Sequence, residues 1–529
     1  MPTHGPRQRP LAITLLSLLA LLAGCAAGPP AGSAATTGGA ASPTAGTAPV
    51  TAPSATVAPG PGRSRSAPNI IYVLTDDLSW NLVQYMPQVQ QMQKDGLTFN
   101  QFIVTDSLCC PSRSSVFTGL YPHDTGVFTN GKNSKGQDDG GYAVFNQRGN
   151  EAKSVAPALQ QVGYRTAFMG KYLNGYDPTA TNGGSTAYVP PGWTEWDGAG
   201  SAYKEFDYDL NENGTVHHYG HDPKDYLTDV MAAKGTAFID ASAGTGAPFL
   251  MEIATFAPHK PSTPAPRDEA AFPGLAAPHD PAYGVAATDG PEWLKRIPAL
   301  TAGNSKNIDE EFAKRVRSVQ AVDQMIGRLR AELTAKGLAD NTYLVFGSDN
   351  GYHMGEHDLR SGKQTAFETD IKVPLVVVGP QVAPGQHSDA LASNIDLNPT
   401  FLQLGGAAVP SEVDGHSLVP LLAGGSAPDW RQAVLVEHHG PDGTVVDPDA
   451  PGPMSGNPPT YEAVRTPTAT YVEYANGERE YYDLTADPSE LHNLAGTLST
   501  ERLAQLHTIL VGLQSCHGGQ ACEAAGKHS

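Results

Sequence analysis

Runs of consecutive apolar residues, each stopped by acidic, glycine or proline residues, constrain the fold of this chain most strongly. Such runs are typical of strands that are buried on both faces of a parallel sheet. They lie at 69–75, 96–104, 164–169, 248–256, 341–348 and 372–378. Helical patterns alternate with them, and the clearest is the amphipathic stretch 310–336. This order predicts an α/β sandwich with a large, mostly parallel central sheet.

Polar side chains follow two of these runs directly. Asp76 and Asp77 end the first run, and Asp349 and Asn350 end the one at 341–348. In open α/β sheets, ligands bind beyond the carboxyl ends of the strands. Three carboxylates and an amide oxygen form a hard, oxygen-only donor set, which suits Ca²⁺ or Mg²⁺ better than zinc. We therefore expect one divalent cation, with Ca²⁺ as first choice, on these residues.

Residues 108–119 read LCCPSRSSVFTG and predict an anion site at the start of a helix. Pro111 suits the first helical position, where its missing N–H costs nothing. A helix that begins there directs its free N–H groups and its positive end toward Cys109. Arg113 adds a fixed positive group one turn further on. The competing interpretation is a structural cysteine, since free cysteines are among the most buried residues.

The same stretch resembles the sulfatase signature C-x-P-S-R-x-x-x-L-T-G, with Phe117 in place of the usual leucine. The resemblance spans roughly 68–522, and the segments GKYLN, SDNGYH and DIKVPL are similar to the N-acetylglucosamine-6-sulfatase-like branch. It implies an alkaline-phosphatase-like fold. It also implies that a formylglycine-generating enzyme converts Cys109 to formylglycine. The hydrated aldehyde is then the nucleophile, and Cys109 also becomes a ligand of the metal.

Three further residues are candidates for the reaction. Lys171 follows a strand and a glycine, which favours a sulfate-binding role over that of a solvated surface lysine. Lys363 resembles the second sulfate-binding lysine of the family. His259 lies at a strand end between prolines and is the expected general acid, although a loop histidine without a role is the alternative. By resemblance, Arg113 and both lysines hold the sulfate oxygens.

One departure from the family pattern concerns a proton transfer. Many sulfatases have G-K-W-H where this chain has GKYLN, so Asn174 stands in place of a histidine. The base for the second half-reaction is therefore unassigned. His353 and His357 are secondary candidates.

Two other functions are compatible with these residues. One is a phosphodiester or phosphonate monoester hydrolase that uses the same modified cysteine. The other is a non-catalytic, lipid-anchored protein that binds sulfated glycans and keeps Cys109 unmodified. Within the sulfatase interpretation, a sulfated amino sugar, another glycan sulfate and an aryl sulfate all remain open as substrates.

The N-terminus predicts export. Arg7 and Arg9 precede an apolar run at 11–22 that is too short for a confident membrane span, as in a secretory signal. The sequence LAGC at 22–25 resembles a bacterial lipobox, which implies cleavage after residue 24 and lipid attachment at Cys25; ordinary cleavage and secretion is the alternative. Residues 25–66 are rich in Ala, Gly, Pro, Ser and Thr. They predict a flexible tether that holds the protein on the outer face of the bacterial cell membrane.

The remaining chain is divided into a catalytic domain at 67–427 and a C-terminal subdomain at 428–529. The subdomain is expected to contain a small antiparallel sheet and a helix at about 500–513. Cys516 and Cys522 lie close together in an exported segment and predict a disulfide. Cys110 is assigned to structural packing. The Pro- and Gly-rich stretch 262–309 predicts a lid.

The acidic composition excludes one class of partner. The formal net charge is −20 and the isoelectric point is about 5.2, which argues against general nucleic-acid binding. An anionic substrate must therefore be attracted by a local basic pocket rather than by the whole surface.

Overall fold

The computed structural model of the protein describes residues 67–132, 136–424, 429–440, 452 and 454–527. The predicted signal peptide, Cys25 and the tether lie outside the described residues, and so does the predicted boundary at 427/428. Among the residues described, no helix is both long and apolar enough to cross a membrane.

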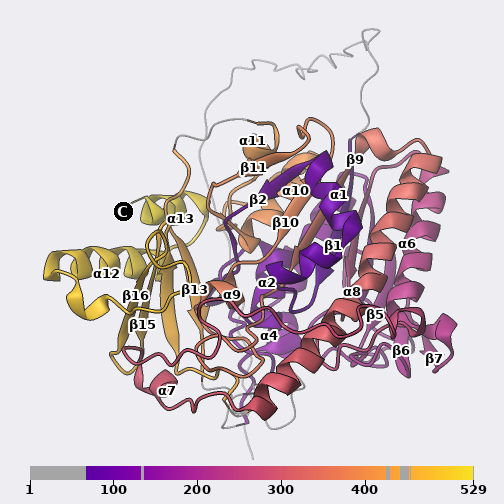
Figure 1. Cartoon of the computed structure of the whole chain (residues 1–529). Helices are drawn as coiled ribbons and strands as arrows, with labels where there is room; N and C mark the ends of the chain where they lie inside the picture. The colour runs from indigo at the N-terminus through magenta and orange to yellow at the C-terminus, as the bar shows by residue number, and fades with distance from the viewer. Residues whose placement is uncertain (1–66, 133–135, 425–428, 441–451, 453, 528–529) are drawn as a thin grey trace, which may run out of the picture. The chain divides into compact units, whose positions relative to one another are not determined.

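A ten-stranded sheet forms the centre of the fold (Figure 1). In spatial order its strands are β11 (Gln386–Ser388), β2 (Leu97–Phe99), β10 (Leu375–Val378), β9 (Thr342–Ser348), β1 (Asn69–Thr75), β8 (Phe249–Ala254), β4 (Arg165–Lys171), β5 (Glu195–Ala199), β6 (Tyr208–Glu212) and β7 (Thr215–Tyr219). The central strands β9, β1, β8, β4 and β5 run parallel. On one side β10 runs antiparallel to β9; on the other, β6 runs antiparallel to β5, and β7 runs antiparallel to β6. The predicted mostly parallel sheet is confirmed.

Both faces of this sheet are covered by helices. Along β1, Ile70 and Tyr72 belong to one apolar core and Ile71 and Val73 to the other, as the alternation of side chains in a strand requires. The first core is completed by α2 (Cys109–Thr118), α5 (Val155–Gln161) and α10 (Leu397–Gly405). The second is completed by α1 (Pro87–Asp95), α6 (Leu227–Ala243) and α8 (Ala302–Ala335). These two layers confirm the predicted α/β sandwich.

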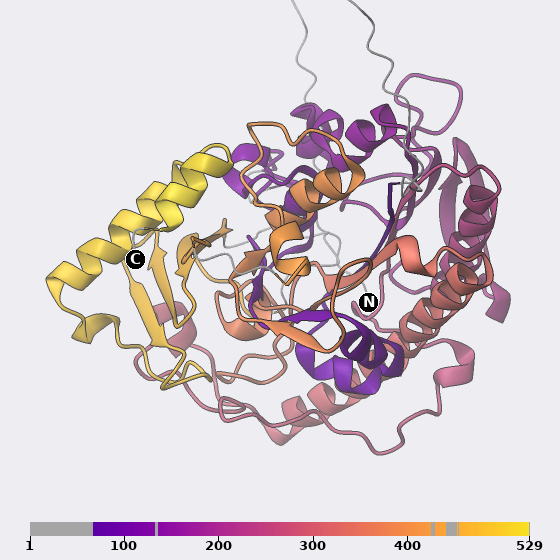
Figure 2. The ribbon, with the colours of Figure 1, turned by 90° about the horizontal axis from the view of Figure 1, so that it is seen from above.

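A four-stranded antiparallel sheet, coloured orange to yellow in Figure 1, follows the central sheet in the chain. Its strands are β13 (Val434–His438), β14 (Tyr461–Arg465), β15 (Ala469–Tyr474) and β16 (Arg479–Asp483). Helix α12 (Thr500–Gln514) packs Leu506, Ile509 and Leu510 onto it (Figure 2). The small sheet and its helix were predicted, whereas the last helix, α13 (Gly519–Gly526), was not.

Several predicted boundaries are wrong. Helix α2 begins at Cys109, so Pro111 occupies its third position rather than its first. The run at 96–104 splits into β2 and β3 (Phe102–Ile103), which belong to different sheets. Helix α4 (Gly141–Gln147) was not among the predicted elements. The predicted lid ends early because α8 starts at Ala302, where Thr301 and Asn304 form a capping box.

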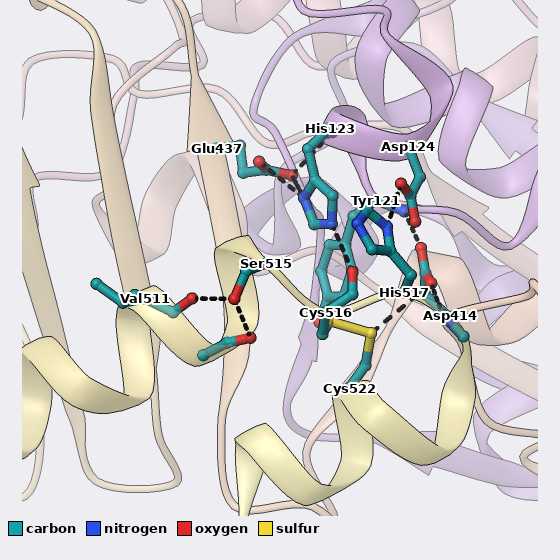
Figure 3. Close-up of a disulfide and its surroundings, with 12 residues drawn as sticks. Tyr121, His123, Asp124, Asp414, Glu437, Val511, Ser515, Cys516, His517 and Cys522 are labelled. Atoms are coloured by element: carbon teal, nitrogen blue, oxygen red, sulfur yellow. Dashed lines mark hydrogen bonds and ion pairs between the residues drawn. A yellow bond between two sulfur atoms is a disulfide. The ribbon is translucent and has the colours of Figure 1, made fainter.

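The predicted disulfide between Cys516 and Cys522 is confirmed, and it lies beside α3 (Pro122–Thr125) (Figure 3). His123 at the start of α3 has both ring nitrogens bonded. Its Nδ1 lies 2.9 Å from a carboxylate oxygen of Glu437, and its Nε2 lies 3.0 Å from the Cys516 carbonyl oxygen. Since both partners are acceptors, both ring nitrogens donate and the imidazole is protonated. Burial alone would lower the pKa of His123, but the bond to Glu437 raises it to about 9.

This contact predicts a pH dependence of stability. Folding raises the pKa of His123 from 6.5 to about 9, so its contribution is full below pH 6.5 and is lost as the pH rises through 9. We expect the free energy of unfolding to fall by up to about 3 kcal/mol across this window. His123→Gln should flatten the slope measured by thermal melts, whereas His507→Gln, at an exposed pair with Glu473, should keep it. An unchanged slope in His123→Gln would assign the dependence to another group.

Candidate active site

The carboxyl ends of the parallel strands bring the predicted residues together. Asp76 follows β1, Asp349 follows β9, and Lys171 is the last residue of β4. Because β1 pairs with both β8 and β9, and β8 pairs with β4, these ends meet at one edge of the sheet. The start of α2 places Cys109 at the same edge.

Cys109 is fully buried at the centre of this cluster. Its Sγ lies 2.9 Å from Lys363 Nζ and 3.3 Å from Asp76 Oδ1. Ligand atoms of Asp76, Asp77 and Cys109 all lie within 4.8 Å of one another. The sulfur therefore contacts both a cation and an acidic pair, which is the environment of a reactive position rather than of an apolar packing cysteine.

Each carboxylate of the site has a basic partner at hydrogen-bond distance. Lys171 Nζ lies 2.6 Å from Asp76 Oδ2, and Lys363 Nζ lies 2.7 Å from Asp77 Oδ1. Arg113 Nε donates to Asp349 Oδ2 at 2.7 Å. All of these side chains are buried. Since buried charges are stable only when paired, the cluster depends on each of its members.

Burial is the largest influence on the pKa of the Asp349 carboxyl group. It raises the pKa of Asp349 to about 6, although the adjacent Arg113 opposes the shift. Burial disfavours the charge of Arg113 itself, but Asp349 and Asp76 together raise its pKa above the ordinary value. Arg113 also donates to the carbonyl oxygen of Lys171 at 2.8 Å, so it braces the groups around the anion site.

His259 lies at the rim of the cluster, on the loop after β8. Its Nδ1 is 2.7 Å from the carbonyl oxygen of Lys260, so Nδ1 carries the proton and donates. Nε2 lies 3.6 Å from Asp77 Oδ2. The imidazole packs on the ring of Tyr203, with 4.7 Å between centroids. This geometry directs Nε2 toward Asp77 in the cluster.

The donor set fits a hard divalent cation. Asp76 and Asp77 offer carboxylate oxygens beside Cys109. The Oδ1 atom of Asn350 is buried and has no hydrogen-bond partner among the described residues, which is unusual for a buried amide oxygen. Asp349 accepts the backbone N–H groups of Asp77 and Asn350 at 3.1 and 2.8 Å, and so orients both. These four residues are the ones that could hold the ion.

The sequence interpretation missed Arg315, which lies on α8. It lies beside the apolar core positions of this helix, is 1% exposed and donates to the carbonyl oxygen of Asp77. Asp77 has a φ of 64°, in the left-handed region, which turns its carbonyl toward α8. The guanidinium also lies 4.2 Å from the ring centre of Tyr352. An arginine three residues after Phe312, on an otherwise apolar helix face, was the available signal.

The two secondary histidines do not join the cluster of Cys109. His353 Nδ1 pairs with Asp370 at 2.9 Å, and His357 stacks on Phe367 with 4.0 Å between ring centroids. Asn174, in place of a family histidine, instead contacts Cys110 and Tyr203.

The fold is an α/β sandwich with a cluster of acidic residues and a buried cysteine at the carboxyl edge of its central sheet, and solved structures of hydrolases share it. The family model "Sulfatase" matches residues 68–407, and "N-sulphoglucosamine sulphohydrolase, C-terminal" matches residues 355–515. The chain belongs to the sulfatase family and is a sulfuric ester hydrolase. Enzymes of this family generally use a metal ion and formylglycine.

Named relatives agree with this assignment. N-acetylglucosamine-6-sulfatase of Homo sapiens is 36% identical over 487 residues, which cover 87% of this chain and 86% of that protein. The extracellular sulfatase SULF-1 homolog of Drosophila melanogaster is 35% identical over 383 residues, which cover 70% of this chain and 33% of that protein. A protein solved with its substrate D-glucosamine-2-N,6-O-disulfate has the same fold, with a TM-score of 0.69 and 22% identity, and the match covers 88% of this chain and 100% of that one.

Proposed function

We propose that the protein hydrolyses the sulfate ester of a sulfated amino sugar, such as a glucosamine 6-sulfate, after conversion of Cys109 to formylglycine. The observation that carries the proposal is the position of Cys109 Sγ, 2.9 Å from Lys363 Nζ and 3.3 Å from Asp76 Oδ1 at the start of a buried helix. The extensive identity with N-acetylglucosamine-6-sulfatases supports this substrate class.

Each residue of the site is assigned a role. Lys171 and Lys363 bind the sulfate oxygens, and Arg113 holds Asp349 and adds positive charge behind them. Asp76, Asp77, Asp349 and Asn350 hold one divalent ion, Ca²⁺ in preference to Mg²⁺, with residue 109 beside it. When bound, the ion supplies a Lewis acid for a sulfate oxygen and for the hydroxyl of residue 109.

His259 transfers protons in both halves of the reaction. In the first half, Nε2 protonates the leaving alcohol, since Nδ1 is held by the carbonyl of Lys260. In the second half, a base is required, and the amide of Asn174 cannot accept a proton near neutral pH. We assign this role to the imidazole of His259, which is neutral after the first transfer and whose Nε2 lies 3.6 Å from Asp77 of the same cluster.

The predicted export signal, lipid anchor and tether, and the division of the chain into domains, belong to the same proposal. An exported enzyme with a signal at 1–24, lipid at Cys25 and a tether at 25–66 would act outside the cell on extracellular glycans. The catalytic domain would cover 67–427 and the C-terminal subdomain 428–529. A formylglycine-generating enzyme is then a required partner during maturation.

Mass spectrometry and a substrate comparison test the proposal together. In protein from its native host, we expect the peptide that contains Cys109 to show the mass loss of the thiol-to-aldehyde conversion. The same preparation should hydrolyse glucosamine 6-sulfate faster than it hydrolyses a phosphodiester or a phosphonate monoester. The phosphonate monoester is included because a phosphonate monoester hydrolase of Agrobacterium radiobacter has a similar fold, with a TM-score of 0.62. Faster turnover of either phosphorus ester would overturn the sulfatase substrate. An unmodified Cys109 without turnover would favour a glycan-binding protein.

A further inference from the structure

A cavity of about 370 Å³ adjoins the catalytic cluster. Its lining includes Lys171, Asn174, Tyr203 and Phe256. Lys171 connects the two spaces, since its Nζ also lies 2.6 Å from Asp76. His259 packs on the ring of Tyr203, which lines the cavity. The proposed sulfate-binding lysine and a direct neighbour of the proposed general acid therefore line one cavity, which is where the alcohol part of the ester is expected to lie.

Cys110, the residue after Cys109 on α2, contacts the lining of this cavity. Its Sγ accepts the backbone N–H of Asn174 at 2.9 Å and lies 3.4 Å from Asn174 Oδ1, to which the thiol donates. The backbone N–H of Cys110 donates to Asn130 Oδ1 at 2.9 Å. One residue of α2 thus fixes two amide side chains that line the cavity.

These contacts determine how the side-chain amide of Asn174 is oriented in the cavity. Because the thiol holds Oδ1, the NH₂ group points to the other side, where Nδ2 donates to the hydroxyl of Tyr203 at 3.3 Å. Tyr172 and Tyr176 add aromatic surface to the same cavity. Amide donors and phenol groups beside aromatic rings suit a polar ring that carries hydroxyl or acylamino oxygens, rather than a flat aryl group.

We propose that Cys110 is a positioning residue that holds Asn174 against Tyr203, and that Asn174 selects esters of hydroxyl-rich rings. The inference rests on the proposed function, since it assigns the cavity to the leaving alcohol. A cysteine that served only to fill space would need no polar partner. Here the thiol is both donor and acceptor to a single residue, so its chemistry as well as its volume is used.

Binding to a protein that cannot turn over its substrate tests this assignment. In a Cys109→Ala background, calorimetry would compare glucosamine 6-sulfate with inorganic sulfate, which has no sugar ring to occupy the cavity. We expect Asn174→Ala and Cys110→Ala each to weaken the sugar sulfate about tenfold. The affinity for inorganic sulfate should change less than about twofold. Cys110→Ser, whose hydroxyl both donates and accepts, should recover most of the loss.

The double variant separates positioning from packing. If Cys110 acts through Asn174, Cys110→Ala should add little to the loss caused by Asn174→Ala. Equal weakening of both ligands, additive losses, or no loss would each overturn the inference while leaving the sulfatase function intact. If the Cys109→Ala protein binds neither ligand, and the unaltered enzyme hydrolyses no sulfate ester, the proposed function fails and this inference fails with it.

Discussion

Replacement of Cys109 by serine should reduce sulfate ester turnover by about 10⁴-fold or more, the scale found when a nucleophile is removed from a catalytic unit. Serine keeps the size of the side chain at this buried position but does not undergo the thiol-to-aldehyde conversion. A serine sulfate would also be a stable ester, whereas a hydrated aldehyde carries a second hydroxyl that releases sulfate. Turnover measured with glucosamine 6-sulfate, together with thermal melts, checks this expectation.

Ser114, five residues after Cys109 on the same helix, provides a matched control. Ser114 is buried on α2, its Oγ has no hydrogen-bond partner among the described residues, and it lies at a variable position of the signature. Ser114→Ala should therefore keep both turnover and the thermal midpoint. Turnover in Cys109→Ser within tenfold of the unaltered enzyme would contradict a formylglycine nucleophile.

The central strands of the fold could be predicted because their burial leaves a clear pattern. A strand covered on both faces, such as β1 or β9, needs apolar residues at nearly every position. The edge of the sheet leaves no such pattern. β7, which reads TVHHY, is almost entirely exposed, and its pairing depends on backbone bonds to β6 rather than on apolar burial.

The site was predictable to the extent that its residues follow buried strands. Asp76 and Asp349 meet because parallel strands end at the same edge, and a sequence reveals which residues end strands. Arg315 and Cys110 act from helices, through contacts with segments distant in sequence. Their importance depends on which helix face meets which loop, and only the packed structure defines that.

Among the predicted metal ligands, Asn350 is the one whose replacement we expect to reduce turnover most. Asp76, Asp77 and Asp349 are already balanced by two lysines and Arg113, so a sulfate ester adds uncompensated negative charge to a buried site. A divalent cation would offset that charge, and we expect the Oδ1 of Asn350, which has no hydrogen-bond partner in the described part of the chain, to be one of its ligands. We expect Asn350→Ala to reduce turnover at least about 100-fold, since even residues behind the direct ligands cost 10- to 100-fold.

Stability provides a readout that does not depend on activity. A cation present at 100 times its Kd stabilises a folded protein by about 2.7 kcal/mol, so removal by a chelator should lower the thermal midpoint and added Ca²⁺ should restore it. Asn350→Ala should lose this Ca²⁺-dependent shift, and Asn350→Asp, which keeps an oxygen ligand, should retain it. Asn398→Ala is the control: it removes a buried amide that bonds the Phe117 carbonyl, so it should lower the baseline midpoint but keep the shift. A full Ca²⁺ response in Asn350→Ala would remove this residue from the ligand set, because the same oxygen cannot be both absent and required.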